Sequence, residues 1–487
     1  MDASELARIA ALEMRANGFE PVFAPEVLRE AEHLPLTGQE SAGDIRDLRQ
    51  RPWFSIDNVD TLDLDQLSWA EALPDGSVRL AVAVADVDAM VQRASSIDAH
   101  AAANTTSVYT AAGVFPMLPP LLSNDRTSLR EGEQRLSMVV EMTFAADGSI
   151  IGSDLYRAAV CNHAKLDYDS VAAWLEATAP LPVAVTSAIA SNAALQLQLR
   201  LHDQVARSLR QMRQQRGALN VATSQARPVF DKGELVDLRA DKRNRAKDLI
   251  ADLMIATNGV TARFLAQRGQ PSLRRVLQQP RRWDRLVTLA ELHGATLPPA
   301  PDALALDHFL TARREADPSG FEDLSLAVVK LLGSGAYAAA AAGAPPAGHF
   351  GLAVNDYAHS TAPNRRYVDL VTQRLLKATL AQQPMPYAMD ELDAIAKHCT
   401  IQEDSASTIE RRVLKAAGAY LLQHRIGERF DAIVTGVAPK GTFVRISSPL
   451  VEGRLLRGFE GLDVGDTVTV ALMGVDIAQR FIDFQGV

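Results

Sequence analysis

Cysteine, an excess of basic charge and long apolar runs are all scarce or missing in this chain. The two cysteines, Cys161 and Cys399, lie far apart, which excludes a disulfide framework and a cysteine-ligated metal site. The formal net charge of −9 argues against a protein that coats nucleic acid indiscriminately, because such binding depends on Lys and Arg neutralising phosphates. A local basic channel is still compatible with that total.

Two further absences concern membranes and secretion. No apolar run approaches the roughly 18 residues that a membrane-spanning helix needs, and the N-terminus lacks the basic start of a secretion signal. We therefore expect a protein without membrane contact in a reducing cytoplasm. At 487 residues, with 47% hydrophobic and 22% charged residues, the chain is long enough for two to four domains. No feature of the sequence requires a dimer, so we expect a monomer.

The densest chemical feature is an acidic run flanked on both sides by aromatic and aliphatic residues. Asp57, Asp60, Asp63 and Asp65 fall within nine residues. Carboxylates packed together without a countercharge repel one another and raise one another's pKa. A bound hard cation relieves this repulsion, and Mg²⁺ is the first candidate. A solvated acidic loop accounts for the number of carboxylates equally well, because charge runs usually face water.

The pattern of apolar residues predicts an α+β multidomain protein. Residues 1–43 contain two short helical patterns, which form either a helix-turn-helix or a small helical cap on the next domain. Residues 44–425 mix strands and helices and form a mixed α/β domain. Within them, residues 78–85 are typical of a buried strand, and residues 137–144 lead into a hairpin that turns at Asp147-Gly148.

The C-terminal region, residues 426–487, has a different texture. Its short alternating strands and Gly-rich turns predict an all-β OB barrel of five strands. Phe430 and Phe443 could each offer a face on which a nucleic-acid base stacks, or could belong to the barrel core. The core is the better expectation for Phe430.

Basic residues are clustered although the total charge is acidic. Arg207, Arg210, Arg213 and Arg216 are spaced three apart, which places them along one face of a predicted helix. Such a stripe can follow a phosphate backbone, and it can equally be a solvated helix face. The spacing alone favours the solvated face.

Several segments, read together and in order, resemble the ribonuclease II and ribonuclease R (RNB) family. The matching segments are residues 44–48, 53–67, 83–87, 107–124, 164–169, 216–219, 246–258 and 357–370. The resemblance extends from about residue 44 to the C-terminus and includes a terminal S1-type OB domain.

The resemblance implies a processive exoribonuclease that degrades single-stranded RNA from its 3′ end to 5′-nucleoside monophosphates. Asp57, Asp63 and Asp65 would hold one or two Mg²⁺ ions, with Asp63 and Asp65 at the catalytic centre. Gln66 would be a further, uncharged metal ligand. Arg365 would clamp the scissile phosphate, because its planar fork of donors suits a phosphate better than a point charge does.

The same resemblance implies contacts between the chain and RNA. Tyr168 would stack on the terminal base, Asp252 would contact the ribose, and Glu410 would contact nucleotides deeper in the channel. The barrel pattern, and not the resemblance, adds Phe443 to these predicted RNA contacts as a stacking surface. The alternatives are that Tyr168 packs between helices and that the two acids are surface charges. We expect a structural role for His359.

Two departures from the family pattern stand out. The acidic motif of the family ends in two adjacent aspartates, whereas the second position here is Gln66, which places a second metal in doubt. Asp60 is close enough in sequence to compensate. The well-known members also carry two cold-shock domains in front, where this chain has about 43 residues. We expect a wider channel mouth that admits duplexes with a 3′ overhang.

Two other functions compete with the exoribonuclease. One is an RNA-binding relative that has lost catalysis through Gln66 and acts as a regulator or adaptor. The other is a carboxylate-metal phosphatase for small molecules, which the arginine stripe and the OB domain disfavour. Metal-dependent release of mononucleotides separates the exoribonuclease from the RNA-binding relative. RNA affinity separates both of these from the phosphatase.

Overall fold

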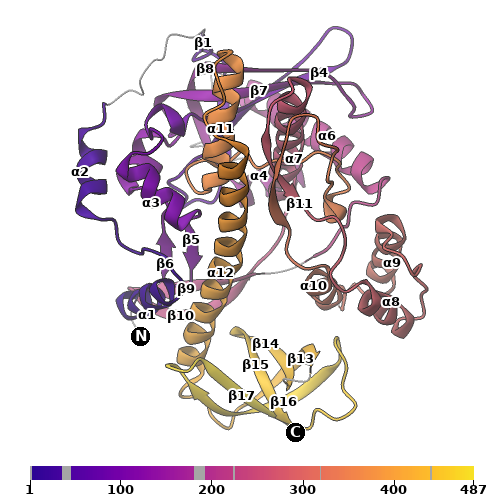
Figure 1. Ribbon diagram of the computed structural model, residues 1–487. Helices are drawn as coiled ribbons and strands as arrows, with labels where there is room; N and C mark the ends of the chain where they lie inside the picture. Colours follow the sequence, from indigo (N-terminus) through magenta and orange to yellow (C-terminus); the bar gives the residue numbers. More distant parts are fainter. Residues whose placement is uncertain (1–2, 36–44, 180–191, 223–224, 319, 439–440) are drawn as a thin grey trace.

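A mixed α/β body and a small β barrel make up the protein, joined by one long helix (Figure 1). The structure is a computed structural model and describes residues 3–35, 45–179, 192–222, 225–318, 320–438 and 441–487. Helix α12 (Met389–Leu422) has 34 residues and runs from the α/β body to the barrel. The order of elements and the terminal barrel agree with the α+β multidomain fold that the sequence predicts.

The α/β body is built on a six-stranded sheet. Its strands are β1 (Ile45–Asp47), β2 (Trp53–Asp57), β3 (Gln66–Ala72), β4 (Val78–Ala85), β7 (Gln134–Phe144) and β8 (Ile150–Asp167). β2 pairs with β3 and β8, β3 pairs with β4, β4 with β7, and β7 with β8, so the pairings form a closed circuit with β1 added beside β8. The acidic run therefore connects two neighbouring strands, β2 and β3, in the middle of the strand order.

Two elements of this sheet follow directly from the sequence. The predicted strand 78–85 is β4, and all but one of its residues are buried. The predicted hairpin is β7–β8, and its turn contains Gly148 with φ +85°. A Cβ atom at Gly148 would lie 2.6 Å from Cβ of Ser208, so this position requires glycine both for its backbone conformation and for the close approach of helix α6.

Helices cover the sheet and complete its core. They are α3 (Ser96–Asn104), α4 (Tyr168–Leu175), α6 (Asn192–Gln214), α7 (Arg245–Gln267) and α11 (Tyr367–Leu380). α6 and α7 pack against each other, α6 against β3 and β4, and α7 against β7 and β8. By length and composition α7 could cross a membrane, but 67% of its apolar window is buried in the protein, as expected for a core helix. The expectation that no apolar run approaches the length of a membrane-spanning helix was therefore wrong. A few isolated charges interrupt the sequence of α7, but the helix remains apolar on average.

Three short strand pairs lie outside this sheet. They are β5 (Val108–Thr110) with β6 (Gly113–Phe115), β9 (Gln225–Asp231) with β10 (Glu234–Asp241), and β11 (Ser272–Val276) with β12 (Ala336–Ala340). β5 and β10 both pack against α12. These pairs bring residues from distant parts of the sequence to the long helix.

The two N-terminal helices pack on different parts of the protein. α1 (Ala3–Ala16) buries Leu6, Ala10 and Met14 in a cluster shared with α12 and the barrel. α2 (Pro25–His33) packs against α3 and contributes to the core of the α/β body. This arrangement is the one expected of a helical cap. The predicted domain boundary at residues 43 and 44 lies outside the described residues.

The C-terminal strands close into the predicted barrel of five strands. They are β13 (Arg429–Ala438), β14 (Gly441–Ser447), β15 (Leu450–Arg457), β16 (Thr467–Asp476) and β17 (Phe481–Gly486). Helices α8 (Trp283–Leu292), α9 (Ala303–Ala316) and α10 (Phe321–Leu332) form a separate hydrophobic cluster beside the barrel. Arg445 on β14 donates to Asp323 on α10 at 2.6 Å, so an ion pair joins the barrel to these helices.

We expect Glu13→Ala to loosen the junction of α1, α12 and the barrel. Glu13 is 5% exposed, and its carboxylate accepts from Arg412 of α12 and from Arg480 in the turn before β17. Because both arginines keep part of their side chains in water, we expect the free energy of unfolding to fall by about 1–2 kcal/mol. Chemical denaturation measures this change. The matched substitution Glu32→Ala, at an exposed position of α2, should change it by less than about 0.5 kcal/mol. An equal loss in both variants would contradict the role of Glu13.

Candidate active site

The acidic run is a fixed loop between β2 and β3. β2 ends at Asp57 and β3 begins at Gln66. The Lys165 ammonium group on β8 donates to the carbonyl oxygens of Val59 at 2.9 Å and Thr61 at 2.6 Å. These two bonds hold the outer part of the loop against the sheet.

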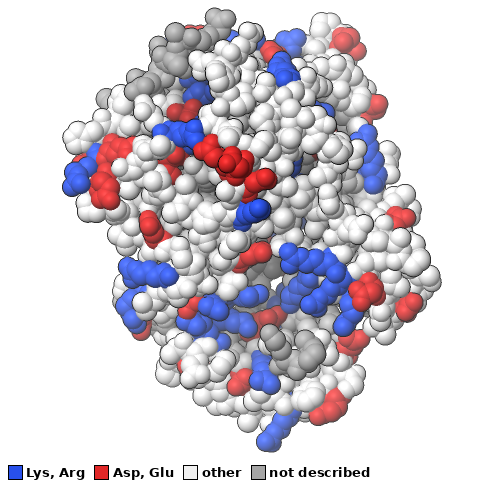
Figure 2. All heavy atoms as spheres, in the orientation of Figure 1, with Lys and Arg blue, Asp and Glu red and all other residues white. Residues whose placement is uncertain are grey.

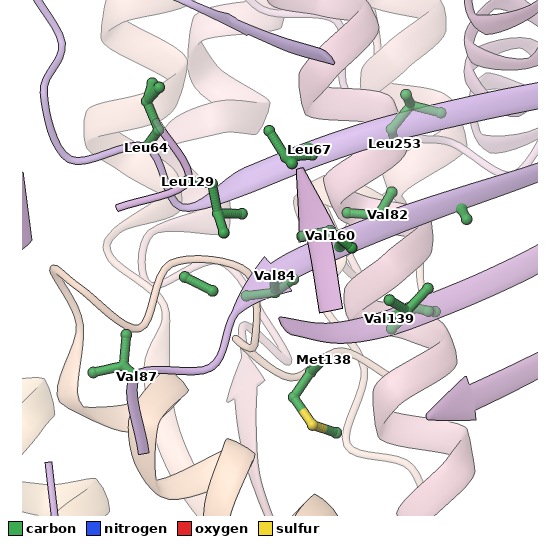
Figure 3. Close-up of a cluster of buried hydrophobic side chains, with 14 of the residues drawn as sticks. Leu64, Leu67, Val82, Val84, Val87, Leu129, Met138, Val139, Val160 and Leu253 are labelled. Carbon is green, nitrogen blue, oxygen red and sulfur yellow. The ribbon is translucent and has the colours of Figure 1, made fainter. Parts of the chain in front are cut away.

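The inner part of the loop is anchored by burial. Leu64 and Leu129 lie next to each other among the buried side chains that Figure 3 shows, and the N–H of Leu129 donates to the carbonyl of Leu64 at 2.9 Å. The Ser128 hydroxyl donates to the carbonyl of Leu62 at 2.6 Å and accepts from the N–H of Leu64 at 3.0 Å. The loop is thus held on both sides, as the flanking apolar residues predict.

Three of the four aspartates lie close enough for their charges to interact. Burial is the largest cause that raises the pKa of Asp57, Asp63 and Asp65. The charge of Asp57 further raises the pKa of Asp63, and the charge of Asp63 further raises that of Asp65, which reaches about 7. The Arg365 guanidinium lowers the pKa of all three. The solvated acidic loop is therefore wrong for these three residues, because their carboxylates are desolvated beside one cation.

Asp60 points away from this group. Its side chain is 72% exposed, and both carboxylate oxygens accept from the Arg227 guanidinium at 2.9 and 3.0 Å. The suggestion that Asp60 could compensate for Gln66 is not supported, because the carboxylate is committed to β9 at the surface.

Gln66 has a partner across the site. Its side-chain Nε2 donates to the backbone carbonyl of Thr361 at 2.6 Å. The amide therefore links the start of β3 to the loop before α11. This contact gives Gln66 a role other than the metal ligand that the resemblance implies.

Arg365 lies beside the aspartates because the loop that carries it is hydrogen-bonded to Asp65. The N–H of Asn364 donates to Oδ1 of Asp65 at 3.0 Å, and Nε of Arg365 lies 3.6 Å from Oδ2 of Asp65. The Thr127 hydroxyl donates to Oδ1 of Asn364 at 2.6 Å. The Arg365 side chain is 39% exposed, so its guanidinium can reach an incoming anion. The structure thus brings Arg365 and Asp65 together across 300 residues of sequence.

Tyr109 also belongs to the site, although the sequence analysis did not assign it a role. Its hydroxyl donates to Oδ2 of Asp63 at 3.3 Å, and its backbone N–H donates to Oε1 of Glu410 at 3.1 Å. The residue is 42% exposed. It lies on β5, in a segment that carries the family resemblance, and that position is the signal that could have identified it.

Tyr168 lies on the side of Asp57, at the start of α4. Burial raises the pKa of the Tyr168 hydroxyl, and the nearby charge of Asp57 raises it further. The Lys247 ammonium lies 6.0 Å from the centre of the Tyr168 ring. Tyr168 is therefore close enough to the aspartates for the predicted base contact, which stays a prediction.

Asp252 is an ion-pair partner inside the protein. The residue is 3% exposed, and its carboxylate accepts from both Arg210 and Arg213 of α6. A ribose contact by Asp252 would require one of these bonds to open.

The predicted arginine stripe on α6 is divided between the interior and the surface. Arg210 and Arg213 turn inward to Asp252, whereas Arg207 and Arg216 are exposed.

The other predicted residues lie further from the aspartates. Glu410 on α12 is tied to β5 through Tyr109, and burial raises the pKa of the Glu410 carboxyl. Phe443 on β14 is partly buried, with the Lys415 ammonium 5.7 Å from its ring centre. Phe430 packs against Phe484 of the barrel core at 6.3 Å between ring centres, as expected.

His359 occupies the structural position that we expected. Its Nδ1 is 2.8 Å from the hydroxyl of Tyr337, and burial lowers its pKa well below the ordinary value. The ring also meets Tyr337 and Tyr357 edge-on, at 5.5 Å between centres in each case. The enclosed imidazole therefore joins the segment before α11 to Tyr337 of β12.

The donor set suits a hard divalent cation, although it is incomplete. Within the described part of the chain, no three His, Cys, Asp or Glu side chains form a ready-made metal site. Asp57, Asp63 and Asp65 nevertheless present buried carboxylates whose mutual repulsion a cation would relieve. Mg²⁺ is commonly bound by one or two carboxylates together with substrate phosphate oxygens. The residues fit such a cation if RNA supplies the remaining ligands.

Comparison with known protein families assigns most of the chain. Residues 45–382 match the RNB domain. This chain belongs to the RNB family. Residues 428–487 match the RNase II-type exonuclease C-terminal S1 domain, so the barrel is the RNB-associated S1 domain that the sequence predicts.

Individual RNB relatives agree with this assignment. Ribonuclease R of Thermotoga maritima is 32% identical over 459 residues, covering 88% of this chain and 60% of the relative. Ribonuclease R of Vibrio parahaemolyticus is 30% identical over 480 residues, covering 90% of this chain and 55% of the relative. The RNB chain described here therefore spans little more than half the length of these curated relatives.

Solved structures show the same fold. Mycoplasma genitalium RNase R in complex with ribose-methylated single-stranded RNA superimposes with a TM-score of 0.87 at 23% identity, covering 98% of this chain and 77% of that one. Yeast Ssd1, a pseudonuclease, superimposes with a TM-score of 0.67 at 18% identity, covering 91% of this chain and 55% of that one. The RNB fold alone therefore does not decide whether a protein is an active nuclease. The residues of the site decide it.

Proposed function

We propose that this RNB protein is an exoribonuclease that shortens single-stranded RNA processively from its 3′ end and releases 5′-nucleoside monophosphates. The observation that carries the proposal is the group of three desolvated carboxylates beside the exposed fork of Arg365. Family membership and the relatives named ribonuclease R support the reaction class. As expected from the sequence, we propose a monomer that acts in the cytoplasm.

The chemistry requires a water molecule to attack the last phosphodiester phosphorus while the 3′ oxygen of the preceding nucleotide leaves. Asp57, Asp63 and Asp65 would hold the cation, which when bound activates the water and stabilises the leaving oxygen. The Arg365 guanidinium would neutralise the charge that develops on the phosphate oxygens. Because Gln66 is engaged by Thr361, we propose that these three carboxylates supply the protein ligands.

The surface charge supports a path for RNA. Figure 2 shows Lys and Arg side chains gathered on both sides of a hollow just above the barrel, although the total charge is −9. The S1 barrel borders this hollow, and an OB barrel is a common platform for single-stranded nucleic acid. We propose that RNA passes between these basic side chains, contacts Phe443 and Glu410 on its way, and reaches Arg365. A contact with Asp252 would follow only after one of its bonds to Arg210 or Arg213 opens.

We expect Tyr109→Ala to weaken RNA binding more than Tyr109→Phe. The exposed ring of Tyr109 beside Asp63 offers a stacking face for the 3′-terminal base, in addition to Tyr168. Loss of one base–aromatic stack should raise the Kd for a short RNA about 10-fold, because such a stack contributes about 1–3 kcal/mol. Tyr109→Phe keeps the ring and should stay within about 2-fold. Fluorescence anisotropy with a labelled RNA measures both, and equal losses would assign the effect to the hydroxyl.

A time course on 5′-labelled single-stranded RNA, with Mg²⁺ and with chelator, tests the proposed function. We expect metal-dependent shortening to a small end product with mononucleotide release. Intact RNA that is nevertheless bound would support the second candidate, an RNB-type binding protein that has lost catalysis. A duplex with a 3′ overhang tests the wider channel mouth, and stalling several nucleotides before the duplex would contradict it.

A further inference from the structure

Asp65 and Gln66, which are adjacent in sequence, both bind the loop that carries Arg365. Asp65 accepts a hydrogen bond from this loop, and Gln66 donates one to it. Asp65 accepts at Oδ1 from the N–H of Asn364 at 3.0 Å, and Gln66 donates from Nε2 to the carbonyl of Thr361 at 2.6 Å. Asn364 is 1% exposed and Thr361 3% exposed, so both contacts are shielded from water. The turn that carries Arg365 is therefore attached at two points, to the end of the acidic loop at Asp65 and to the start of β3 at Gln66.

The chemistry of the second contact requires a donor at position 66. The carbonyl of Thr361 can only accept, and an ionised carboxylate can only accept as well. An aspartate or glutamate at this position would set two acceptors against each other and add a fourth negative charge beside Asp65. A neutral donor, such as the amide of Gln66, satisfies the buried carbonyl without adding charge, and an ionised acid does not.

We propose that Gln66 is a positioning residue, which holds the 361–365 turn and thereby the Arg365 guanidinium in register with Asp65, and that it is not a ligand of the cation. The proposal rests on the proposed exoribonuclease function, because it assigns Gln66 a part in orienting the group that meets the phosphate. It also removes the doubt that Gln66 marks an inactive protein. The uncharged residue completes the site by a contact that an acid could not make.

Gln66→Met is the variant that separates the two roles of Gln66. Methionine has a similar length and shape, and it can neither donate to Thr361 nor act as an oxygen ligand. Gln402→Met is the matched control, since Nε2 of Gln402 also donates to a backbone carbonyl, that of Ala103, at 3.0 Å, and ties α12 to α3 rather than to the Arg365 turn. Thermal unfolding of both variants shows whether each is folded.

We expect Gln66→Met to lower kcat about 10- to 100-fold, because a small misplacement of a positioned group costs about that much. Calorimetric titration with Mn²⁺ of the metal-free protein bound to a short RNA that cannot be hydrolysed should give a Kd within about 2-fold of wild type. Loss of a metal ligand or of its direct support changes metal affinity about 10- to 100-fold. Gln402→Met should keep kcat within about 2-fold, because the buried contact that it removes joins α12 to α3 and not to the Arg365 turn.

The double variant Gln66→Met/Arg365→Lys tests whether Gln66 acts through Arg365. If it does, the double variant loses no more activity than Arg365→Lys alone, because coupled residues are not additive. A 10-fold weaker Mn²⁺ affinity in Gln66→Met, an unchanged kcat, or multiplicative losses in the double variant would each overturn the proposal. A wild-type protein that releases no mononucleotide would instead overturn the proposed function, which keeps the two failures distinct.

Discussion

Asp65→Asn is expected to abolish mononucleotide release and, in metal-free buffer at pH 8, to stabilise the fold. Asp65 is 3% exposed and lies between Asp63 and Arg365, so its charge is the least solvated of the acidic loop. We expect the rate of mononucleotide release to fall at least about 1,000-fold. The reason is that Asp65 would hold the cation together with Asp57 and Asp63, and removing one member of such a group disables the whole group. A gel time course with mononucleotide analysis measures this loss.

The sign of the stability change follows from the pKa of Asp65. Burial raises that pKa from 3.8 to about 7 in the folded state, so the folded protein binds the proton more tightly than the unfolded chain does. The wild type therefore loses stability as the pH rises from about 4 through 7, and asparagine, which does not titrate, removes this loss. We expect Asp65→Asn to be more stable by roughly 2 kcal/mol at pH 8, with a smaller difference at pH 5.

Added Mg²⁺ should reverse the order, because the cation stabilises only the variant that binds it. Asp60→Asn is the matched control: the same chemical change in the same loop, at a carboxylate that is 72% exposed and paired with Arg227. It should leave activity and stability nearly unchanged. If Asp60→Asn and Asp65→Asn behaved alike, the assignment of Asp65 to the reacting centre would be wrong.

Arg365→Ala is expected to lower kcat about 100- to 1,000-fold, the usual effect of removing a group that stabilises charge in the transition state. Its Nε lies 3.6 Å from Asp65, and 39% of its side chain stays exposed toward solvent, where a phosphate can approach. Arg365→Lys keeps the charge and loses the planar fork, so it should recover only part of the rate. Steady-state kinetics on a short RNA with a fixed 3′ end measure these effects.

The same substitution should move the pH dependence in a defined direction. Arg365 lowers the pKa of Asp57, Asp63 and Asp65, so its removal raises all three. At limiting Mg²⁺ the acid limb of kcat/KM should shift to higher pH, because the carboxylates must lose their protons before they bind metal. Arg227→Ala removes another arginine near the acidic loop and should shift neither kcat nor the limb. A shift common to both variants would point to general surface charge instead of Arg365.

Much of the site was predictable because its parts lie in short, chemically dense segments. The acidic run, the position of Arg365 and the closed C-terminal barrel each follow from local composition or from the family resemblance. Tyr109 was missed as a site residue because a single tyrosine on a three-residue strand carries no periodic or compositional signal. Its place in a segment that carries the family resemblance is the one signal in the sequence, and its contact with Asp63 appears when β5 packs beside the acidic loop.

The sequence by itself determined the inventory: which carboxylates are close together, which strands are apolar enough to be buried, and that the chain is an α+β protein with a C-terminal barrel. The tertiary structure decided which of these side chains are partners. It turned Asp60 outward to Arg227, enclosed Asp252 between two arginines, and set the amide of Gln66 on the carbonyl of Thr361. The physical reason is that charges and amides are satisfied by whatever the fold brings within hydrogen-bonding distance, and residues 66 and 361 meet only after the sheet and α11 have packed.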